Sequence, residues 1–538
     1  MRADCVCNVA TGCSREDVQK FNVCEGAAQA DMRTVSIFRT WLIAQTALSA
    51  RRADLVAAGL GAVSVLALPP IHLVPVLLLA IPGLLILIAA APTTRAAARR
   101  GWWFGFGLNL LGLYWITEAI LVEAARYWWL VPLAVPALAA FMAGFVAAPA
   151  AIAKRAGTEL AMLLALGGTW TLSDIVRQFI LSGFPWNLWG TAWAIPGLAG
   201  DILLQPVALI GAHGLGLITL LLAGAPLWGR RALVPMLAVV SVWAGISAWR
   251  LNLPAPAETG RQIVLIQGNI AQGQKWDRAR AMEIFRHYLQ LTADGVAQTA
   301  NGTAIVIWPE TASPFLLEQD PDARAAIANA ANGQPVLAGS VRWDAQRRPR
   351  NSLIPILARG DMGPVYDKWH LVPFGEVQPG WFPLPIQIVP GGGFAAGPGP
   401  QTIRLPDVPP FGPLICYEAI FGGEIVDRTD RPAWLVNITN DAWFGQSAGP
   451  YQHLAAARMR AVEEGLPLVR AANTGVSAVY DGFGHERGRL RLGQTGILSI
   501  PLPGAAPPSL FATVGLAGAI TLTMLTLLVS WFSNRHRF

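Results

Sequence analysis

The feature that most limits what this chain can fold into is a long stretch with very few charges. Between Asp54 and Arg250 the sequence holds only sixteen charged residues, and they fall in short clusters that separate apolar runs. A membrane-spanning helix needs about 20 mainly apolar residues. Eight runs fit this requirement, roughly at 55–70, 72–92, 102–122, 128–151, 158–178, 203–228, 232–249 and 509–532. We therefore predict a polytopic α-helical membrane bundle of about eight spans.

A second kind of sequence interrupts this pattern between about 262 and 505, where the charge density is that of a globular domain. Short β-branched runs there predict buried strands. They lie at 263–266, 304–308, 335–339, 413–416 and 433–437. Helical stretches at 278–293, 321–331 and 453–464 alternate with them, which indicates an α/β layered domain. We expect a membrane bundle at 32–250, an inserted catalytic domain at 251–507, and a closing helix with its tail at 508–538.

The distribution of Lys and Arg predicts the orientation of the bundle, because cytoplasmic loops are enriched in these residues. With the N-terminus in the cytoplasm, the cytoplasmic gaps between spans and the chain ends beside the first and last spans hold twelve basic residues, and the opposite gaps hold three. The twelve are Arg39, Arg51, Arg52, Arg95, Arg99, Arg100, Lys154, Arg155, Arg230, Arg231, Arg535 and Arg537, and the three are Arg126, Arg177 and Arg250. Both termini are then cytoplasmic and the inserted domain lies outside. The uncharged, Trp-rich segment 179–200 is predicted to be an interfacial loop.

Composition and motifs exclude several other classes. The chain is 53% hydrophobic and 14% charged, against roughly 25% charged in soluble domains, so an ordinary soluble enzyme is nearly excluded. The net charge of +7 is explained largely by the basic cytoplasmic side, and no basic–aromatic face predicts nucleic-acid binding. We find no Walker A loop, H-E-x-x-H or credible dinucleotide fingerprint, and expect neither a cofactor nor a metal.

Four of the five cysteines fall within the first 24 residues, in a segment unlike the rest of the chain. Their spacing is not that of a zinc ribbon. We interpret 1–31 as an extra segment that is not translated if synthesis begins at Met32. Cys416 is then the single cysteine, which fits a nucleophile better than a disulfide framework.

Three positions of the globular domain carry reactive side chains: Glu310 after a predicted strand, Lys368 in a segment rich in Trp, His and Pro, and Cys416 at the end of another strand. Taken one at a time, each residue can be explained without a catalytic role, since buried cysteines are usually small hydrophobes and most lysines are solvated. Together they form one chemical set. A thiol needs a base to become a thiolate, and the oxyanion formed on attack needs a positive or N–H donor.

These residues lie in motifs that resemble those of the carbon–nitrogen hydrolase (nitrilase) superfamily. The motifs are Trp308-Pro-Glu310, Lys368 within Lys-Trp-His-Leu-Val-Pro-Phe-Gly-Glu, and Ile415-Cys-Tyr-Glu418. Further motifs, set in this membrane frame, resemble more narrowly the apolipoprotein N-acyltransferase family of Gram-negative-type bacteria. They are Asn437-Ile-Thr-Asn-Asp-Ala-Trp-Phe-Gly445, Arg458-Met-Arg460, Arg470-Ala-Ala-Asn-Thr-Gly475 and Gly183-Phe-Pro-Trp-Asn-Leu-Trp-Gly190.

The resemblance implies an αββα sandwich on the periplasmic face of the inner membrane and a ping-pong acyl transfer. Cys416 would attack a phospholipid ester and form a thioester. The free α-amine of a lipoprotein's S-diacylglyceryl cysteine would then take the acyl chain. Glu310 would be the general base and Lys368 would stabilise the oxyanion.

Supporting roles follow from the same resemblance. The backbone N–H of Tyr417 would help Lys368 to stabilise the oxyanion, and Glu376 would keep Lys368 in place. Glu418 matches a further position of the family that supports the catalytic residues. The Trp-rich loop at 186–193 and the glycine-rich loop at 391–394 are candidate walls or lids of an acyl groove, or else an interfacial anchor and a flexible connection.

Two other functions remain open from the sequence. The first is a membrane-tethered amidase or nitrilase that hydrolyses its acyl-enzyme with water, because the three reactive residues do not choose the acceptor. The second is a transporter with an accessory outer domain. Transport sites usually show ionisable residues at mid-membrane, and here Glu118 is the main such residue.

Overall fold

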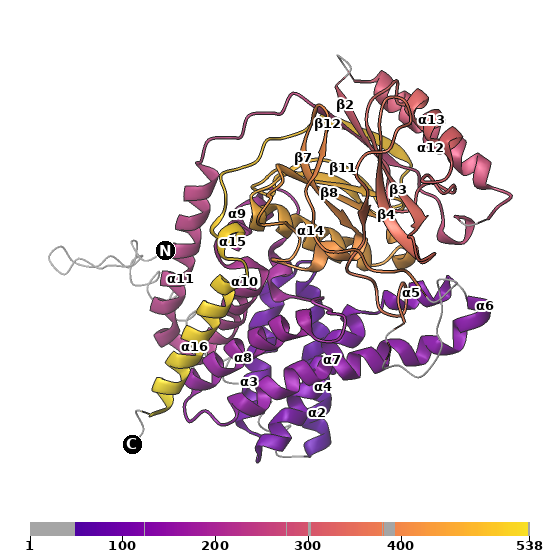
Figure 1. Cartoon of the computed structure of the whole chain (residues 1–538). Helices are drawn as coiled ribbons and strands as arrows, with labels where there is room; N and C mark the ends of the chain where they lie inside the picture. The colour runs from indigo at the N-terminus through magenta and orange to yellow at the C-terminus, as the bar shows by residue number, and fades with distance from the viewer. Residues whose placement is uncertain are drawn as a thin grey trace, which may run out of the picture.

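The computed structural model describes residues 49–122, 124–275, 277–299, 303–378, 380 and 393–535. A helical bundle forms one half of the molecule and an α/β domain forms the other, and the last helix returns to the bundle (Figure 1). The N-terminal segment 1–31, the alternative start at Met32, and Gly391 and Gly392 of the glycine-rich loop lie outside the described residues.

A helix lies in each of the eight segments that the hydropathy pattern singles out. They are α2 (Ala50–Ser64), α3 (Leu77–Ala89), α4 (Thr94–Gly112), α7 (Val131–Ala153), α8 (Glu159–Phe179), α10 (Val207–Gly224), α11 (Leu233–Leu251) and α16 (Ala517–Arg535). The short helices α5 (Ile116–Leu121), α6 (Ala124–Tyr127), α9 (Leu198–Leu203) and α15 (Leu510–Val514) connect them. Helix α4 packs between α2 and α7, and α16 packs against α8 and α10.

Length and hydropathy make four helical segments of the described chain candidate membrane spans: Ala124–Ala153, Glu159–Phe179, Val207–Leu251 and Ala517–Arg535. Helices α2 and α3 have only 15 and 13 residues. At 1.5 Å per residue neither covers about 30 Å of hydrocarbon by itself. The prediction of about eight spans therefore stays a prediction.

The Trp-rich segment is a loop, as predicted, with one short 3₁₀ helix, η4 (Trp189–Trp193). Its expected role as an interfacial anchor is wrong for two of its indoles, because Trp186 and Trp189 are buried inside the protein. The Nε1–H of Trp186 donates to Gln452 of the α/β domain at 2.7 Å. Trp186 thus connects this loop to the α/β domain.

Two six-stranded sheets make up the α/β domain. The first has the order β12-β1-β2-β3-β4-β5 and the second β11-β10-β9-β8-β7-β6. Strands of the first are β1 (Gln262–Gln267), β2 (Ala304–Ile307), β3 (Val336–Trp343), β4 (Pro349–Ile356), β5 (Tyr366–Asp367) and β12 (Gly496–Pro501). Strands of the second are β6 (Ile403–Leu405), β7 (Val408–Ile415), β8 (Trp434–Thr439), β9 (Leu468–Ala472), β10 (Ser477–Tyr480) and β11 (Glu486–Leu490). Within each sheet three central strands are parallel, β1-β2-β3 and β7-β8-β9.

The two sheets pack face to face, and helices cover their outer faces (Figure 1). Helices α12 (Ala281–Ala297) and α13 (Pro321–Ala330) lie over the first sheet, and α14 (Gly449–Glu464) lies over the second. Apolar side chains of both sheets form the core between them, among them Leu265, Ile307, Phe411 and Val436. The predicted αββα layering, with its five strands and three helices, is confirmed.

Helix α14 also joins the domain to the bundle. Its Ala455, Met459 and Val462 pack in one buried apolar cluster with Leu204 and Val207, at the start of α10. Because α14 covers the second sheet on one side and contacts α10 on the other, the carboxyl ends of β7 and β8 are held close to the membrane half.

Candidate active site

The three predicted reactive residues follow strands of both sheets. Glu310 comes after β2, Lys368 directly after β5, and Cys416 directly after β7. All three are buried, with 5%, 1% and 7% of their surface exposed. The Lys368 ammonium Nζ lies 3.4 Å from Oε1 of Glu310. The carboxylate and the ammonium, which both follow strands of the first sheet, are thus in contact, and both charges act on the thiol of Cys416 from the second sheet.

Two further side chains hold the Glu310–Lys368 pair. Glu376 accepts a hydrogen bond from Lys368 Nζ at 2.9 Å and another from the backbone N–H of Val372 at 2.9 Å. The amide Nδ2 of Asn351 donates both to Glu310 at 2.6 Å and to Glu376 at 3.0 Å. Two carboxylates therefore share one lysine and one asparagine, which fixes the position of the ammonium.

The surroundings of the site raise the pKa of both the Lys368 ammonium and the Cys416 thiol. Burial alone lowers the pKa of Lys368, but the carboxylates of Glu376 and Glu310 outweigh it and raise that pKa above its ordinary value. Burial raises the pKa of the Cys416 thiol, the Glu310 carboxylate raises it further, and Lys368 opposes both. At neutral pH the lysine is therefore charged and the resting thiol is protonated.

A carboxylate of the next turn ties the Cys416 and Lys368 segments together. Glu418, in the 3₁₀ helix η8 (Cys416–Ile420), accepts from the backbone N–H of Ile415 at 2.6 Å and of Trp369 at 2.7 Å. The hydroxyl of Tyr366 donates to it at 2.9 Å. Burial raises the pKa of Glu418 to about 7, although the two backbone N–H groups favour its charged form.

Tyr417 connects the nucleophile turn to the membrane half. Its hydroxyl donates to the backbone carbonyl of Gly183 at 2.5 Å. Tyr417 also belongs to a buried apolar cluster that contains Trp115 and Trp186 of the membrane half and Phe421 of the domain. Segments from both halves of the chain therefore line the surroundings of Cys416.

Sequence reasoning missed three buried residues next to the site: Asn351, Lys275 and His453. Lys275 donates from Nζ to the backbone carbonyl of Glu310 at 2.7 Å, and burial lowers its pKa to about 8. No motif flags Asn351 or Lys275, which lie far from Glu310 in the sequence. His453 is the first residue of the predicted helix 453–464 and follows the Asn437–Gly445 motif closely in the sequence. This position next to a motif is the signal by which the residue could have been found.

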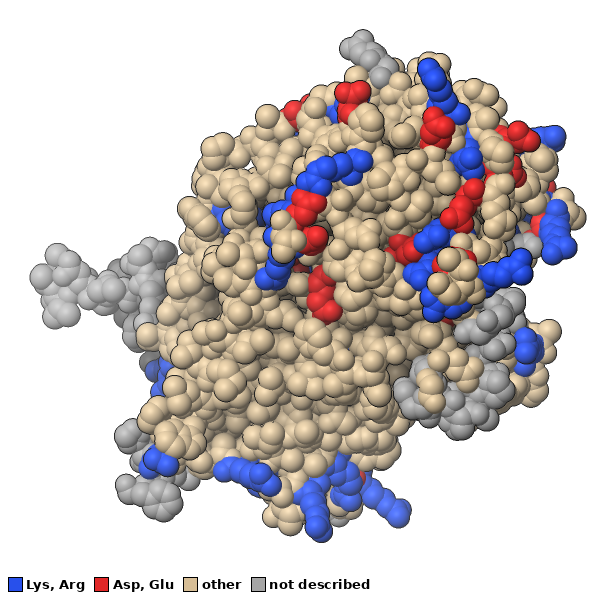
Figure 2. Space-filling model, viewed as in Figure 1, with Lys and Arg blue, Asp and Glu red and all other residues tan. Residues whose placement is uncertain are grey.

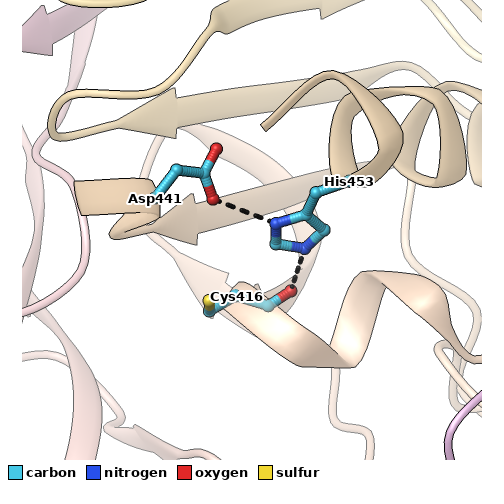
Figure 3. A group of neighbouring side chains, drawn as sticks. All are labelled: Cys416, Asp441 and His453. Atoms are coloured by element: carbon cyan, nitrogen blue, oxygen red, sulfur yellow. Dashed lines mark hydrogen bonds and ion pairs between the residues drawn. The ribbon is translucent and has the colours of Figure 1, made fainter. Parts of the chain in front are cut away.

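His453 belongs to a cluster with Cys416 and Asp441 (Figure 3). Among the described residues, one ligand atom from each of these three lies within 4.8 Å of the others, and thiolate, imidazole and carboxylate are ligands that zinc accepts. Both ring nitrogens of His453 already have hydrogen-bond partners, however: Nδ1 faces Asp441 at 3.0 Å and Nε2 faces the Cys416 carbonyl at 2.9 Å. The arrangement is that of a hydrogen-bonded network.

Comparison with known proteins covers both halves of the chain. The family model for the apolipoprotein N-acyltransferase N-terminal domain matches residues 60–225, and that for carbon-nitrogen hydrolase matches residues 263–500. Among solved structures, an amidase from Nesterenkonia sp. is 18% identical, with a TM-score of 0.35, covering 46% of this chain and 92% of that one.

Curated relatives match over almost their whole length. The apolipoprotein N-acyltransferase of Rhodopseudomonas palustris is 39% identical, over 87% of this chain and 93% of the relative. That of Bradyrhizobium diazoefficiens is 41% identical, over 88% of this chain and 94% of the relative. At these identities and coverages, the chain belongs to the apolipoprotein N-acyltransferase family.

Proposed function

We propose that this protein transfers an acyl chain from a phospholipid, through a thioester on Cys416, to the free α-amine of the S-diacylglyceryl cysteine that begins an apolipoprotein. The observation that carries the proposal is the buried Glu310–Lys368 pair, whose two charges both act on the thiol of Cys416. Family membership supplies the substrate class. The close packing of α14 on the membrane half supports lipid substrates for both steps.

In the first half-reaction, Glu310 accepts the proton of Cys416 as Sγ attacks the ester carbonyl carbon. The Lys368 ammonium stabilises the oxyanion of the tetrahedral intermediate, with the backbone N–H of Tyr417 as a second donor. When the intermediate collapses, the glycerol oxygen leaves and takes the proton back from Glu310. The products are a lysophospholipid and an acyl thioester on Cys416.

In the second half-reaction, the α-amine of the acceptor attacks the thioester. Glu310 now accepts a proton from the amine, and Lys368 again stabilises the oxyanion. Collapse breaks the C–S bond, and the thiolate regains its proton from Glu310. A free α-amine has a pKa near 8, so it is partly neutral at neutral pH and a carboxylate can complete its deprotonation. The product is an amide, and the thiol is restored.

We further propose that the protein is a multi-pass protein of the bacterial inner membrane, with both termini cytoplasmic and the catalytic domain periplasmic. Figure 2 supports this orientation: an uncharged belt separates a lower end that carries Lys and Arg from a domain with mixed charges. Such a belt matches the hydrocarbon layer, and a basic end matches the cytoplasmic side.

The proposal is tested by mass spectrometry of the full chain in detergent. It is supplied with a phospholipid and a short diacylglyceryl-cysteine peptide with a free N-terminus. The native protein is expected to add one acyl chain to the peptide amine and to release lysophospholipid, and Cys416→Ala is expected to do neither. Asn329→Ala, at an exposed position of α13, serves as the control and should behave as the native protein.

The same experiment separates the hydrolase alternative. Lysophospholipid and free fatty acid with an unchanged peptide would show that water is the acceptor. If folded protein turned over neither lipid, the acyltransferase proposal would be wrong.

A further inference from the structure

A buried polar network lies directly behind the nucleophile, and the reaction above does not use it. His453, Asp441 and Arg470 are at most 1% exposed. Arg470 donates from Nη2 to Oδ2 of Asp441 at 2.7 Å, and Asp441 Oδ1 lies 3.0 Å from His453 Nδ1. Arg470 and His453 offset the cost of burying Asp441 and lower its pKa to about 2, so the network holds a carboxylate.

The imidazole reaches the backbone of the nucleophile rather than its thiol. Nε2 of His453 lies 2.9 Å from the carbonyl oxygen of Cys416. Figure 3 shows that oxygen facing the ring, while the sulfur points to the other side of the residue. Because a carbonyl oxygen can only accept, the Nε2 nitrogen must carry the hydrogen and donate it. Burial lowers the pKa of the imidazole, so the neutral ring has no second hydrogen, and its Nδ1 accepts from Nη2 of Arg470 at 3.1 Å. A ring nitrogen that donates to a carbonyl cannot at the same time remove the proton of the thiol.

The backbone of Cys416 needs such support. Its φ is +51°, in the left-handed region that a non-glycine residue rarely occupies. Conformations of this kind are unfavourable and persist only when their surroundings fix them. Before Cys416, the carboxylate of Glu418 accepts a hydrogen bond from the backbone N–H of Ile415. At Cys416 itself, the backbone carbonyl binds His453.

We propose that His453 is a positioning residue: its Nε2–H binds the Cys416 carbonyl and keeps the strained nucleophile turn in the conformation that presents Sγ to Glu310 and Lys368, while Asp441 and Arg470 fix the imidazole. The inference deepens the proposed function, because the thiol it positions is the one assigned to acyl transfer.

Two substitutions separate the contact of Nε2 with the Cys416 carbonyl from the contacts of Nδ1 with Arg470 and Asp441. The amide of His453→Gln reaches about as far as Nε2 and can still donate to the Cys416 carbonyl. The amide of His453→Asn lies near the position of Nδ1, so it keeps the contacts with Arg470 and Asp441 and loses the one with the Cys416 carbonyl. Each variant is measured for kcat and KM of acyl transfer, and for the rate at which iodoacetamide alkylates Cys416, read from the mapped peptide.

We expect His453→Gln to retain kcat within about fivefold. His453→Asn should lose about 10²-fold in kcat with little change in KM, since a misplacement of a catalytic group by about 1 Å has effects of this size. Alkylation of Cys416 should slow about tenfold or more in His453→Asn alone, because the thiol loses its alignment with its base. If His453→Asn does not fold, retention of activity by His453→Gln still supports the proposal.

Equal losses in both variants, or activity retained by His453→Asn and lost by His453→Gln, would overturn it. The alkylation rates do not depend on acyl transfer. If the native protein transferred no acyl chain but the two variants still differed in alkylation, the proposed function would fail and the positioning role would stand.

Discussion

The carboxylate of Glu463 in α14 accepts a hydrogen bond from the backbone N–H of Ala212 in α10, at 2.8 Å. Gly211, with φ of +66°, interrupts α10 at this point, so Ala212 begins a new helical segment whose first N–H groups have no partner within the helix. A carboxylate is a favourable partner for such an end. The catalytic domain thus caps a helix of the membrane half.

The first prediction concerns the pH dependence of this contact. Burial raises the pKa of Glu463 from 4.5 to about 7, with Arg460 opposing it. A carboxyl group whose pKa is raised in the folded state contributes stability below its unfolded pKa, and this contribution is lost as the pH rises through the folded pKa. Between pH 5 and pH 8 the loss from this group is about 3 kcal/mol or less. Glu463→Gln should remove that part of the pH dependence, as measured by thermal unfolding in detergent.

The neighbouring Glu464 provides the control. Its carboxylate binds Arg431 at 2.9 Å and does not contact α10. Glu464→Gln should keep the native slope of Tm against pH. Identical slopes for the native protein and Glu463→Gln would show that Glu463 does not titrate in this range.

A second prediction concerns Asn351, which donates to both Glu310 and Glu376. Asn351→Ala should lower kcat about 10–10²-fold, because both carboxylates lose a shared donor and become free to move. Asn351→Asp should lower it further, since a third carboxylate disfavours the charged form of its neighbours. Steady-state acyl transfer at pH 7 measures both. Asn329→Ala, on the exposed surface of α13, should leave kcat at the native value; an Asn351→Asp variant as active as native protein would refute the role.

The third prediction concerns Gln452, whose Oε1 accepts from Trp115 at 3.1 Å and from Trp186 at 2.7 Å. The two indoles pack with ring centroids 4.8 Å apart. Gln452→Leu leaves both buried N–H groups without this acceptor, and each such loss costs about 1–3 kcal/mol. We expect a lower Tm and a higher KM for phospholipid. Gln446→Leu removes an exposed amide of the same segment and should change neither; equal effects of the two substitutions would contradict the assignment.

A fourth prediction concerns the hydroxyl of Tyr366, which donates to Glu418 at 2.9 Å in the fully buried site. Tyr366→Phe should reduce the free energy of unfolding by about 1–3 kcal/mol and reduce kcat, since Glu418 holds both the Cys416 and the Lys368 segments. Tyr480→Phe is the matched control, because its hydroxyl bonds at 3.3 Å to Glu486, which is exposed. Denaturant unfolding in detergent compares the two, and an equally large loss in the control would argue against the buried bond.

Much of the fold could be predicted because it rests on local patterns. Apolar runs of 20 residues and short β-branched strands report directly on burial, so helices and strands were found where they were expected. The lengths of the helices in the membrane half could be predicted less well. Apolar residues continue past the ends of α3, where Pro75 and the turn before Leu77 leave a helix of 13 residues.

The site could be predicted only where residues lie in recognisable motifs. Glu310, Lys368 and Cys416 are reactive types at strand ends, and the structure brings Lys368 to Glu310. Asn351 and Lys275 are ordinary residues until the fold places them beside Glu310. Likewise, the burial of Trp186 depends on a partner, Gln452, that is 266 residues away in the chain.

The placement of the proposed base and nucleophile in different sheets has a consequence for biogenesis. Glu310 and Lys368 follow strands of the first sheet, whereas Cys416 follows β7 of the second. Until the two sheets dock, the thiol of Cys416 has neither the carboxylate of Glu310 nor the ammonium of Lys368 beside it. The strand β12, which completes the first sheet, is also the last to be synthesised. The architecture therefore delays the pairing of the proposed nucleophile with its proposed base until the final stages of assembly.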